Sequence, residues 1–268
     1  MEEFLSTPFT QPFYFFQLTA IIFGITFIRY LVVSGVYHSI FYVWLKGAFA
    51  GRIINGSNKD RRQMWMEVYR SALTSGIFAF SGTALVIFWQ KGWTQIYTDW
   101  QAFPIWYHPL ALVLALLLHE TYYYWLHRWM HRPKVYRWVH KWHHDSIETS
   151  SLTSFSFHPV ESILQAVVVP ILILVVPMHL YTLFLLLIIM TLSGTINHAG
   201  VEVFPKGFER HWLGKWLIGA THHDLHHKQF RYNFGLYFTF WDHWMNTESP
   251  RYEATFREKT GDFNQNSN

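Results

Sequence analysis

The sequence predicts an all-α, polytopic membrane protein of four to five transmembrane or re-entrant helices with a cytoplasmic, histidine-rich helical cap. Two observations support this fold class. Of the 268 residues, 51% are hydrophobic, 20% are aromatic and only 14% are charged, whereas about a quarter of the residues in a soluble domain are charged. Five apolar runs also approach the ~20 residues that are needed to cross a hydrocarbon core. The core of a soluble protein would explain one or two such runs, but not five.

The five apolar runs follow one another along the chain. They are 17–45, 68–89, 109–125, and the paired runs 163–176 and 180–193 on either side of Pro177. The first run is long and contains Arg29, and we expect one tilted helix there rather than a bent pair. The last two runs are each short, so we expect a hairpin that enters the membrane and returns to the same side.

The loops predict an orientation, because loops on the cytoplasmic side of a membrane carry an excess of Lys and Arg. The loop 46–62 contains Lys46, Arg52, Lys59, Arg61 and Arg62, whereas the loop 90–108 contains only Lys91. The segment after residue 125 and the C-terminal part are basic again. We therefore place these three basic segments on the cytoplasmic side. They account for the net charge of +4, so we do not expect nucleic acid as a partner.

The chain has no cysteine but 17 histidines. The absence of cysteine excludes disulfides, thiolate metal sites and a cysteine nucleophile. All histidines except His38, His108, His119 and His179 fall in segments that we assign to the cytoplasmic side. The histidines therefore gather in one compartment.

Three short segments carry histidines at helical spacing. They are HRWMH at 127–131, HKWHH at 140–144 and HDLHH at 223–227, and NHAG at 197–200 offers one more histidine. Residues three or four apart lie on one face of a helix. Metal sites in helical bundles are built in this way, with several helices each providing ligands.

The spacing excludes several kinds of metal site. The zinc protease motif H-E-x-x-H is absent, its nearest approach being HETYY at 119–123, and so is the Glu-x-x-His of soluble di-iron bundles. A haem needs one or two axial ligands, and a mononuclear zinc has four positions. Imidazole suits iron, zinc and copper alike, but the number of histidines suggests two ions. A pH switch needs no repeated helical spacing; for His211 and His243 we favour a surface or capping role.

The segments YYYWLHRWMH, VHKWHH, SFSFHPVE and THHDLHH, in this order and flanked by apolar runs, resemble the fatty acid hydroxylase/sterol desaturase superfamily. The resemblance spans roughly residues 60 to 245. Within the superfamily, FHPVE and RYNFGLYFTFWDHWMNT are similar to the sterol C-5 desaturases (lathosterol oxidases). The resemblance implies a membrane oxidoreductase that holds two iron ions on histidines and uses O₂ to desaturate or hydroxylate a lipid.

The same resemblance implies the site residues. The implied metal ligands are His127, His131, His140, His143, His144, His198, His223, His226 and His227. Candidates for a further ligand, or for a partner of a ligand's second nitrogen, are His222, His158, Glu120, Asp145 and Asp224. Glu120 departs from the family pattern, which generally has Asp seven residues before the first of these histidines, and a salt bridge to Arg128 is an alternative role. A cap or solvent role is the alternative for the two aspartates.

The resemblance divides the chain into an N-terminal membrane segment with its basic cytoplasmic loop (1–62), a fatty acid hydroxylase-like di-iron domain (63–248) and a polar C-terminal tail (249–268). No Gly-rich nucleotide fingerprint is present, so we expect electrons from a separate ferredoxin- or cytochrome b5-type carrier and its reductase. The substrate is expected to be a sterol or, alternatively, a fatty-acyl lipid. A metal-binding or metal-transporting membrane protein without redox activity is the alternative of another class.

Overall fold

The computed structural model describes residues 6–56 and 60–261. Lys59 of the basic loop, and the ends of the two predicted flanking segments, lie outside the described residues. The described part is mostly helical, as predicted from the sequence. Its strands are the two-residue β1 (Ile96–Tyr97) and β2 (Met178–His179), which pair in parallel and join the loop 91–106 to the turn after Pro177.

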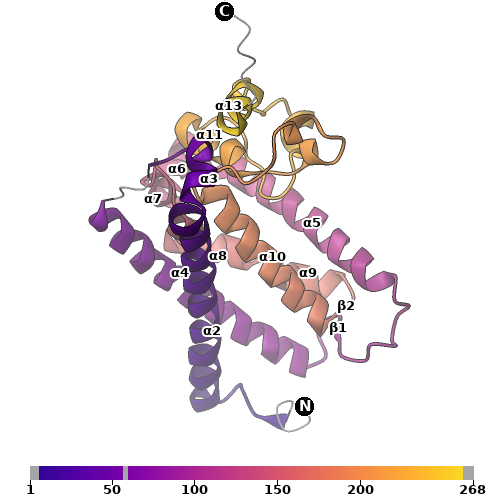
Figure 1. Ribbon diagram of the computed structural model, residues 1–268. Coiled ribbons are helices and arrows are strands. Elements are labelled where there is room, and N and C mark those ends of the chain that lie inside the picture. Colours follow the sequence, from indigo (N-terminus) through magenta and orange to yellow (C-terminus); the bar gives the residue numbers. More distant parts are fainter. Residues whose placement is uncertain (1–5, 57–59, 262–268) are drawn as a thin grey trace, which may run out of the picture.

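The first apolar run forms one continuous helix, as expected. Helix α2 (Pro12–His38) continues without a break into the wider turns of η1 (Ser39–Trp44). Two short turns, α3 (Lys46–Phe49) and η2 (Ala50–Arg52), follow it. Helix α4 (Arg61–Gln90) then begins at Asp60, whose side chain accepts the N–H of Arg62, and crosses α2 (Figure 1).

Three helices of the described chain are long and apolar enough to cross a membrane. They are Pro12–Trp44, Arg61–Gln90 and α10 (Leu180–His198). The third predicted run forms α5 (Tyr107–Met130), but its last turns, HETYYYWLHRWM, are polar and aromatic rather than aliphatic. These apolar helices indicate an integral membrane protein.

The paired runs around Pro177 form a hairpin with unequal arms. The first arm is broken at Val167 into α8 (Pro159–Ala166) and α9 (Val168–Val175), and the second arm is the single helix α10. The largest apolar core lies between α5, α9 and α10, where the small Ala111 and Ala115 meet Leu172 and Leu186. The hairpin therefore packs against α5.

Several of the remaining helices form a layer at one end of the long helices (Figure 1). This layer holds α6 (Pro133–Val139), α7 (Lys141–His144), α11 (Ala220–Gln229) and α13 (Tyr252–Thr260), and the end of α5 with HRWMH reaches it. The other short helices are η3 (Ser151–Phe155), which packs between α2, α4 and α10, and η4 (Phe208–Arg210), η5 (Gly214–Trp216) and α12 (Phe240–Trp244). Figure 1 shows α6, α7, α11 and α13 together at this end, whereas β1 and β2 lie at the opposite end. All three histidine-rich segments thus meet in one layer.

Candidate metal centre

The structure brings the nine histidines that were predicted as ligands into two groups. The five-histidine group contains His127, His131, His140, His144 and His226, and the four-histidine group contains His143, His198, His223 and His227. In each group, one ring nitrogen per histidine lies within 4.8 Å of the others. Every ring is buried except that of His131, which is half-buried.

Neighbouring histidines on one helix belong to different groups. On α11, His223 and His227 face the four-histidine group, whereas His226 faces the five-histidine group. On α7, His143 and His144 divide between the groups in the same way. Successive residues of a helix point about 100° apart, whereas residues at i and i+4 share a face. The spacing of the histidines thus lets each short helix serve both groups.

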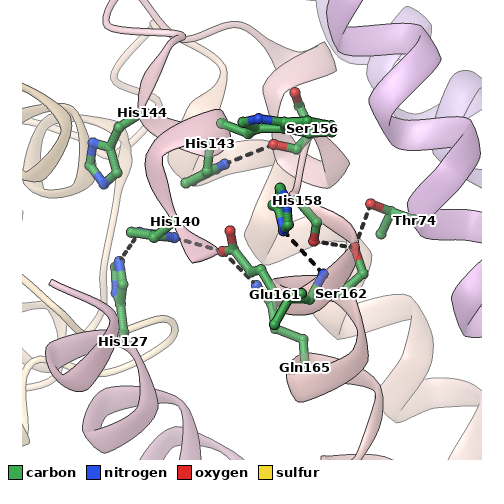
Figure 2. A network of polar contacts seen from close by, with 12 residues as sticks. Thr74, His127, His140, His143, His144, Ser156, His158, Glu161, Ser162 and Gln165 are labelled. Atoms are coloured by element: carbon green, nitrogen blue, oxygen red, sulfur yellow. Dashed lines mark hydrogen bonds and ion pairs between the residues drawn. The ribbon is translucent and has the colours of Figure 1, made fainter. Parts of the chain in front are cut away.

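Three rings of the five-histidine group have their outer nitrogen bound to an acceptor. The Nδ1 of His127 donates to the carbonyl oxygen of Phe234 at 2.8 Å, and the Nδ1 of His226 donates to that of Tyr232 at 2.7 Å. The Nδ1 of His140 donates to Oε1 of Glu161 at 2.8 Å (Figure 2). Such a partner fixes the orientation and tautomer of a metal-binding imidazole.

The four-histidine group is oriented by other parts of the chain. The Nδ1 of His198 donates to the carbonyl oxygen of Gly194, one turn earlier on α10, at 2.7 Å. The Nδ1 of His143 lies 3.4 Å from the carbonyl oxygen of Ser156, as Figure 2 shows. The two groups thus take their outer partners from different segments.

The inner, Nε2 atoms of these rings face one another, and neither atom of such a pair carries a proton that could form a hydrogen bond. The Nε2 atoms of His127 and His140 lie 3.1 Å apart, and so do those of His143 and His198. A carbonyl or carboxylate oxygen only accepts, so the single proton of each neutral ring lies on Nδ1 and each Nε2 carries a lone pair. A cation between such lone pairs removes their repulsion, so these residues fit a metal ion in each group.

Burial keeps the imidazoles of the helical layer neutral. Removal from water and repulsion between neighbouring rings hold the pKa well below the usual 6.5 in His140, His143, His144, His223, His226 and His227. The neutral imidazole is the form that binds a metal. The site is therefore in its metal-binding form at neutral pH.

The two candidate aspartates lie outside both groups. Asp145 pairs with Arg70 at 3.0 Å and with Lys141 at 2.9 Å. Asp224 accepts from Asn55 at 2.9 Å and pairs with Lys228 at 2.7 Å. Both carboxylates contact cations or amides; Asp145 is exposed and follows α7 directly, whereas Asp224 is buried within α11 and is neither a cap nor in solvent.

The remaining candidate histidines also lie outside the two groups. His158 is the N-cap of α8, where its Nδ1 accepts the N–H of Val160 (Figure 2). His222 is buried on another face of α11, with its Nε2 3.9 Å from Glu248. His211 is exposed and accepts the N–H of Gly214 in a turn, which agrees with the surface role that we favoured for it.

Glu120 binds backbone amides rather than a histidine ring or a cation. Its carboxylate is fully buried and accepts the N–H groups of Leu236, Tyr237 and Phe238 at 2.6–3.2 Å. Arg128, the alternative partner, donates to the hydroxyl of Tyr124 instead.

Several buried acids that support the site were not singled out from the sequence. Asp242 accepts the N–H groups of Phe234 and Gly235 at 2.9 and 3.0 Å. Glu202 accepts the N–H of Thr221 in the first turn of α11, where a negative charge stabilises the helix. Glu67 of α4 accepts the hydroxyls that hold the segment after α7, which are those of Ser146, Ser150 and Thr153. The sequence did offer one indication for Glu67, which is an acidic residue directly before the apolar run 68–89.

A family model described as fatty acid hydroxylase matches residues 112–247, half of the chain. The chain belongs to the fatty acid hydroxylase family. The matched region begins in α5 and contains all nine histidines of the two groups. The superfamily that the histidine-rich segments predicted is therefore confirmed.

Curated proteins similar to this family member include sterol desaturases. A Delta(7)-sterol 5(6)-desaturase of Gibberella zeae is 28% identical over 161 residues, which cover 60% of this chain and 48% of the relative. The lathosterol oxidase of Mus musculus is 32% identical over 154 residues, 57% and 50% of the two chains. A probable Delta(7)-sterol 5(6)-desaturase of Neurospora crassa is 25% identical over 234 residues, 87% and 62%. The chain spans about half the length of the first two relatives. No solved structure matches the chain.

Proposed function

We propose that this protein is a membrane di-iron oxidoreductase that uses O₂ and external electrons to desaturate a sterol-like lipid. The observation that carries the proposal is the presence of two adjacent histidine groups whose inner nitrogens converge, with the outer nitrogens of five of the nine rings next to an acceptor. The sterol desaturases among the similar proteins support the sterol C-5 desaturase hypothesis. In this proposal residues 1–62 anchor the chain, 63–248 form the catalytic domain and 249–268 are a tail.

The nine histidines of the two groups would hold two iron ions, the five-histidine group one and the four-histidine group the other. Bound iron supplies redox chemistry that proteins without a cofactor lack, the activation of O₂ for attack on a C–H bond. The chain itself keeps the imidazoles neutral, orients five of them through their Nδ1 atoms and buries the site away from water. A desaturation removes two hydrogens from the lipid and, with two electrons and two protons, converts O₂ into two water molecules.

The electrons require an external carrier of the ferredoxin or cytochrome b5 type and its reductase. The chain carries no Gly-rich nucleotide fingerprint. His131 is the half-buried member of the five-histidine group, and its chain neighbour Arg132 lines a surface hollow together with Arg128. Positive charge at this place suits an acidic partner.

Metal analysis separates this proposal from the metal-binding or metal-transporting alternative. The protein purified in detergent under anaerobic conditions is expected to contain about two iron ions per chain, one for each histidine group. These ions are expected to be oxidised in air. A single exchangeable zinc ion that does not respond to O₂ would favour the non-catalytic alternative.

A substrate assay separates the sterol from the fatty-acyl alternative, a lipid hydroxylase of the same superfamily. The enzyme, reduced by a ferredoxin or cytochrome b5 system, is expected to convert a Δ7-sterol into a product lighter by two hydrogens. A product heavier by one oxygen would indicate hydroxylation. Turnover of acyl lipids alone would contradict the proposal that the substrate is a sterol.

We further propose that α5 and the arm α8–α9 enter the membrane beside the three long helices, giving four to five membrane segments, and that the metal centre lies on the cytoplasmic side. The chain has no cysteine, so a single introduced cysteine is the one thiol that a labelling reagent can modify. Cysteines at the exposed positions Lys46 and Arg251 are expected to react with an impermeant maleimide from the cytoplasmic side, and one at Gln101 from the other side. Labelling of the first two from opposite sides would contradict this topology.

A further inference from the structure

Two buried carboxylates bind five successive backbone N–H groups of one segment, 234–238. Asp242 accepts from Phe234 and Gly235, and Glu120 accepts from the next three residues. Both side chains are fully buried. Charge-assisted hydrogen bonds to backbone amides are the strong ones in proteins, so this segment is held along its whole length.

The carboxylate-bound segment and its immediate neighbour orient two histidines of the same group. The carbonyl oxygen of Phe234 accepts from His127, and that of Tyr232, two residues earlier, accepts from His226. Both of these histidines belong to the five-histidine group. The rings of His198 and His143 in the four-histidine group take their acceptors from Gly194 and Ser156, which lie outside this segment. The segment meets that group beside a ring, where the carbonyl oxygen of Leu236 accepts from Asn197, the residue before His198.

The packing leaves this segment no room to shift. A Cβ added at Gly235 would lie 2.6 Å from the carbonyl oxygen of Phe238, 2.7 Å from Ile218 and 2.9 Å from Oε1 of Glu120. The absence of a side chain at this position therefore allows the backbone to approach the carboxylate. The hydroxyl of Thr247 also donates to Asp242 at 2.8 Å, which fixes the second carboxylate.

We propose that Glu120 and Asp242 are positioning residues that set the metal affinity of the five-histidine group and not that of the four-histidine group. They act through segment 234–238, whose carbonyl at Phe234 and whose link to Tyr232 hold the rings of His127 and His226 in place. The inference rests on the proposed function, because it assumes that each group binds one metal ion.

The test uses the full-length protein with Glu120→Gln and Asp242→Asn, each of which keeps the shape of the side chain and replaces one acceptor oxygen by a donor. Iron(II) binding is measured under anaerobic conditions by competition with a chelator, and the loaded protein is examined by Mössbauer spectroscopy with ⁵⁷Fe. We expect the affinity for one iron equivalent to fall about 10–100-fold, the usual effect of removing a ligand's partner, and the affinity for the other to stay unchanged. The equivalent whose affinity is unchanged should be the one that is no longer bound by His198→Ala.

Glu209→Gln is the matched control, because Glu209 is a buried carboxylate that pairs with Arg257 and is not bound to segment 234–238. It is expected to leave both equivalents unchanged. Hydrogen exchange should show faster exchange of the amides of 234–238 in the two test variants only. If Glu120→Gln does not fold, Glu120→Asp is used instead, because it keeps the negative charge but shortens the side chain. This variant should also weaken the binding of one iron equivalent alone.

Equal weakening of both equivalents, or of neither, would overturn the selective positioning role. A wild-type protein that binds no iron would instead overturn the proposed function, so the two failures are distinguishable.

Discussion

Replacement of His143 or His226 by alanine is expected to abolish turnover while the protein remains inserted in the membrane. His143 belongs to the four-histidine group and His226 to the five-histidine group, and each has its Nε2 3.1 Å from that of a neighbouring histidine. Loss of a ligand's outer partner already costs about 10–100-fold, so loss of the ligand itself should lower turnover by more. Neither residue lies in a candidate membrane span, so insertion should be unaffected.

The measurement compares turnover per molecule of membrane-extracted protein with the iron content of each variant. His211→Ala is the control, because His211 is exposed and lies in neither group, and its turnover should equal that of the wild type. Near-normal turnover in either test variant would remove that histidine from the proposed ligand set.

The histidine groups could be predicted from the sequence because their pattern is local. Pairs such as His127 and His131, or His223 and His227, are four residues apart, and helical geometry alone places such pairs on one face. The division of the rings into two groups depends on how α5, α7, α10 and α11 meet. The sequence suggested two ions from the number of imidazoles, but it could not assign each histidine to a group.

The role of Glu120 could not be predicted, because it depends on a contact between residues 116 to 118 positions apart in the chain. Its position two helical turns before His127 suggested a metal ligand or an ion pair. In the fold, its carboxylate instead points toward the amides of 236–238. Asp242 binds amides only seven and eight positions away, but its sequence context FWDHW gives no sign of a buried acceptor. Four of the five partners of an outer nitrogen described above are backbone carbonyls, which carry no sequence signal whether they are near in the chain, as Gly194 is to His198, or distant, as Phe234 is from His127.

The apolar runs could be located from composition, but their shapes could not. The run 163–176 is interrupted at Val167, where α8 ends and α9 begins. Apolar composition alone marks no boundary there, but Pro170 does, because a proline has no N–H to donate to the carbonyl oxygen of Ala166, four residues earlier. The arm packs against α4 and α5 on either side of this break.

Acid is expected to unfold the histidine-rich layer of the metal-free protein between about pH 6.5 and 4.5. Burial and mutual repulsion hold the pKa of six of its histidines well below 6.5 in the folded state, and the six are His140, His143, His144, His223, His226 and His227. Above pH 6.5 these rings are neutral in both states and cost nothing. Below it the unfolded state binds more protons, so stability falls as the pH falls.

The expected effect is large because the six histidines act together. Once the pH is well below 6.5, each ring that is neutral when folded and protonated when unfolded lowers the free energy of unfolding by about 1.4 kcal/mol per pH unit, so even a few of the six together have a large effect. Typical domains are stable by only about 5–15 kcal/mol. Tryptophan fluorescence and hydrogen exchange of α11, followed from pH 7.5 to 4.5, should show the transition in chelator-treated protein. Iron-loaded protein should unfold at lower pH, because bound metal competes with protons for the same nitrogens. Metal-free protein that is as stable at pH 4.5 as at pH 7 would show that these imidazoles are not held neutral by burial.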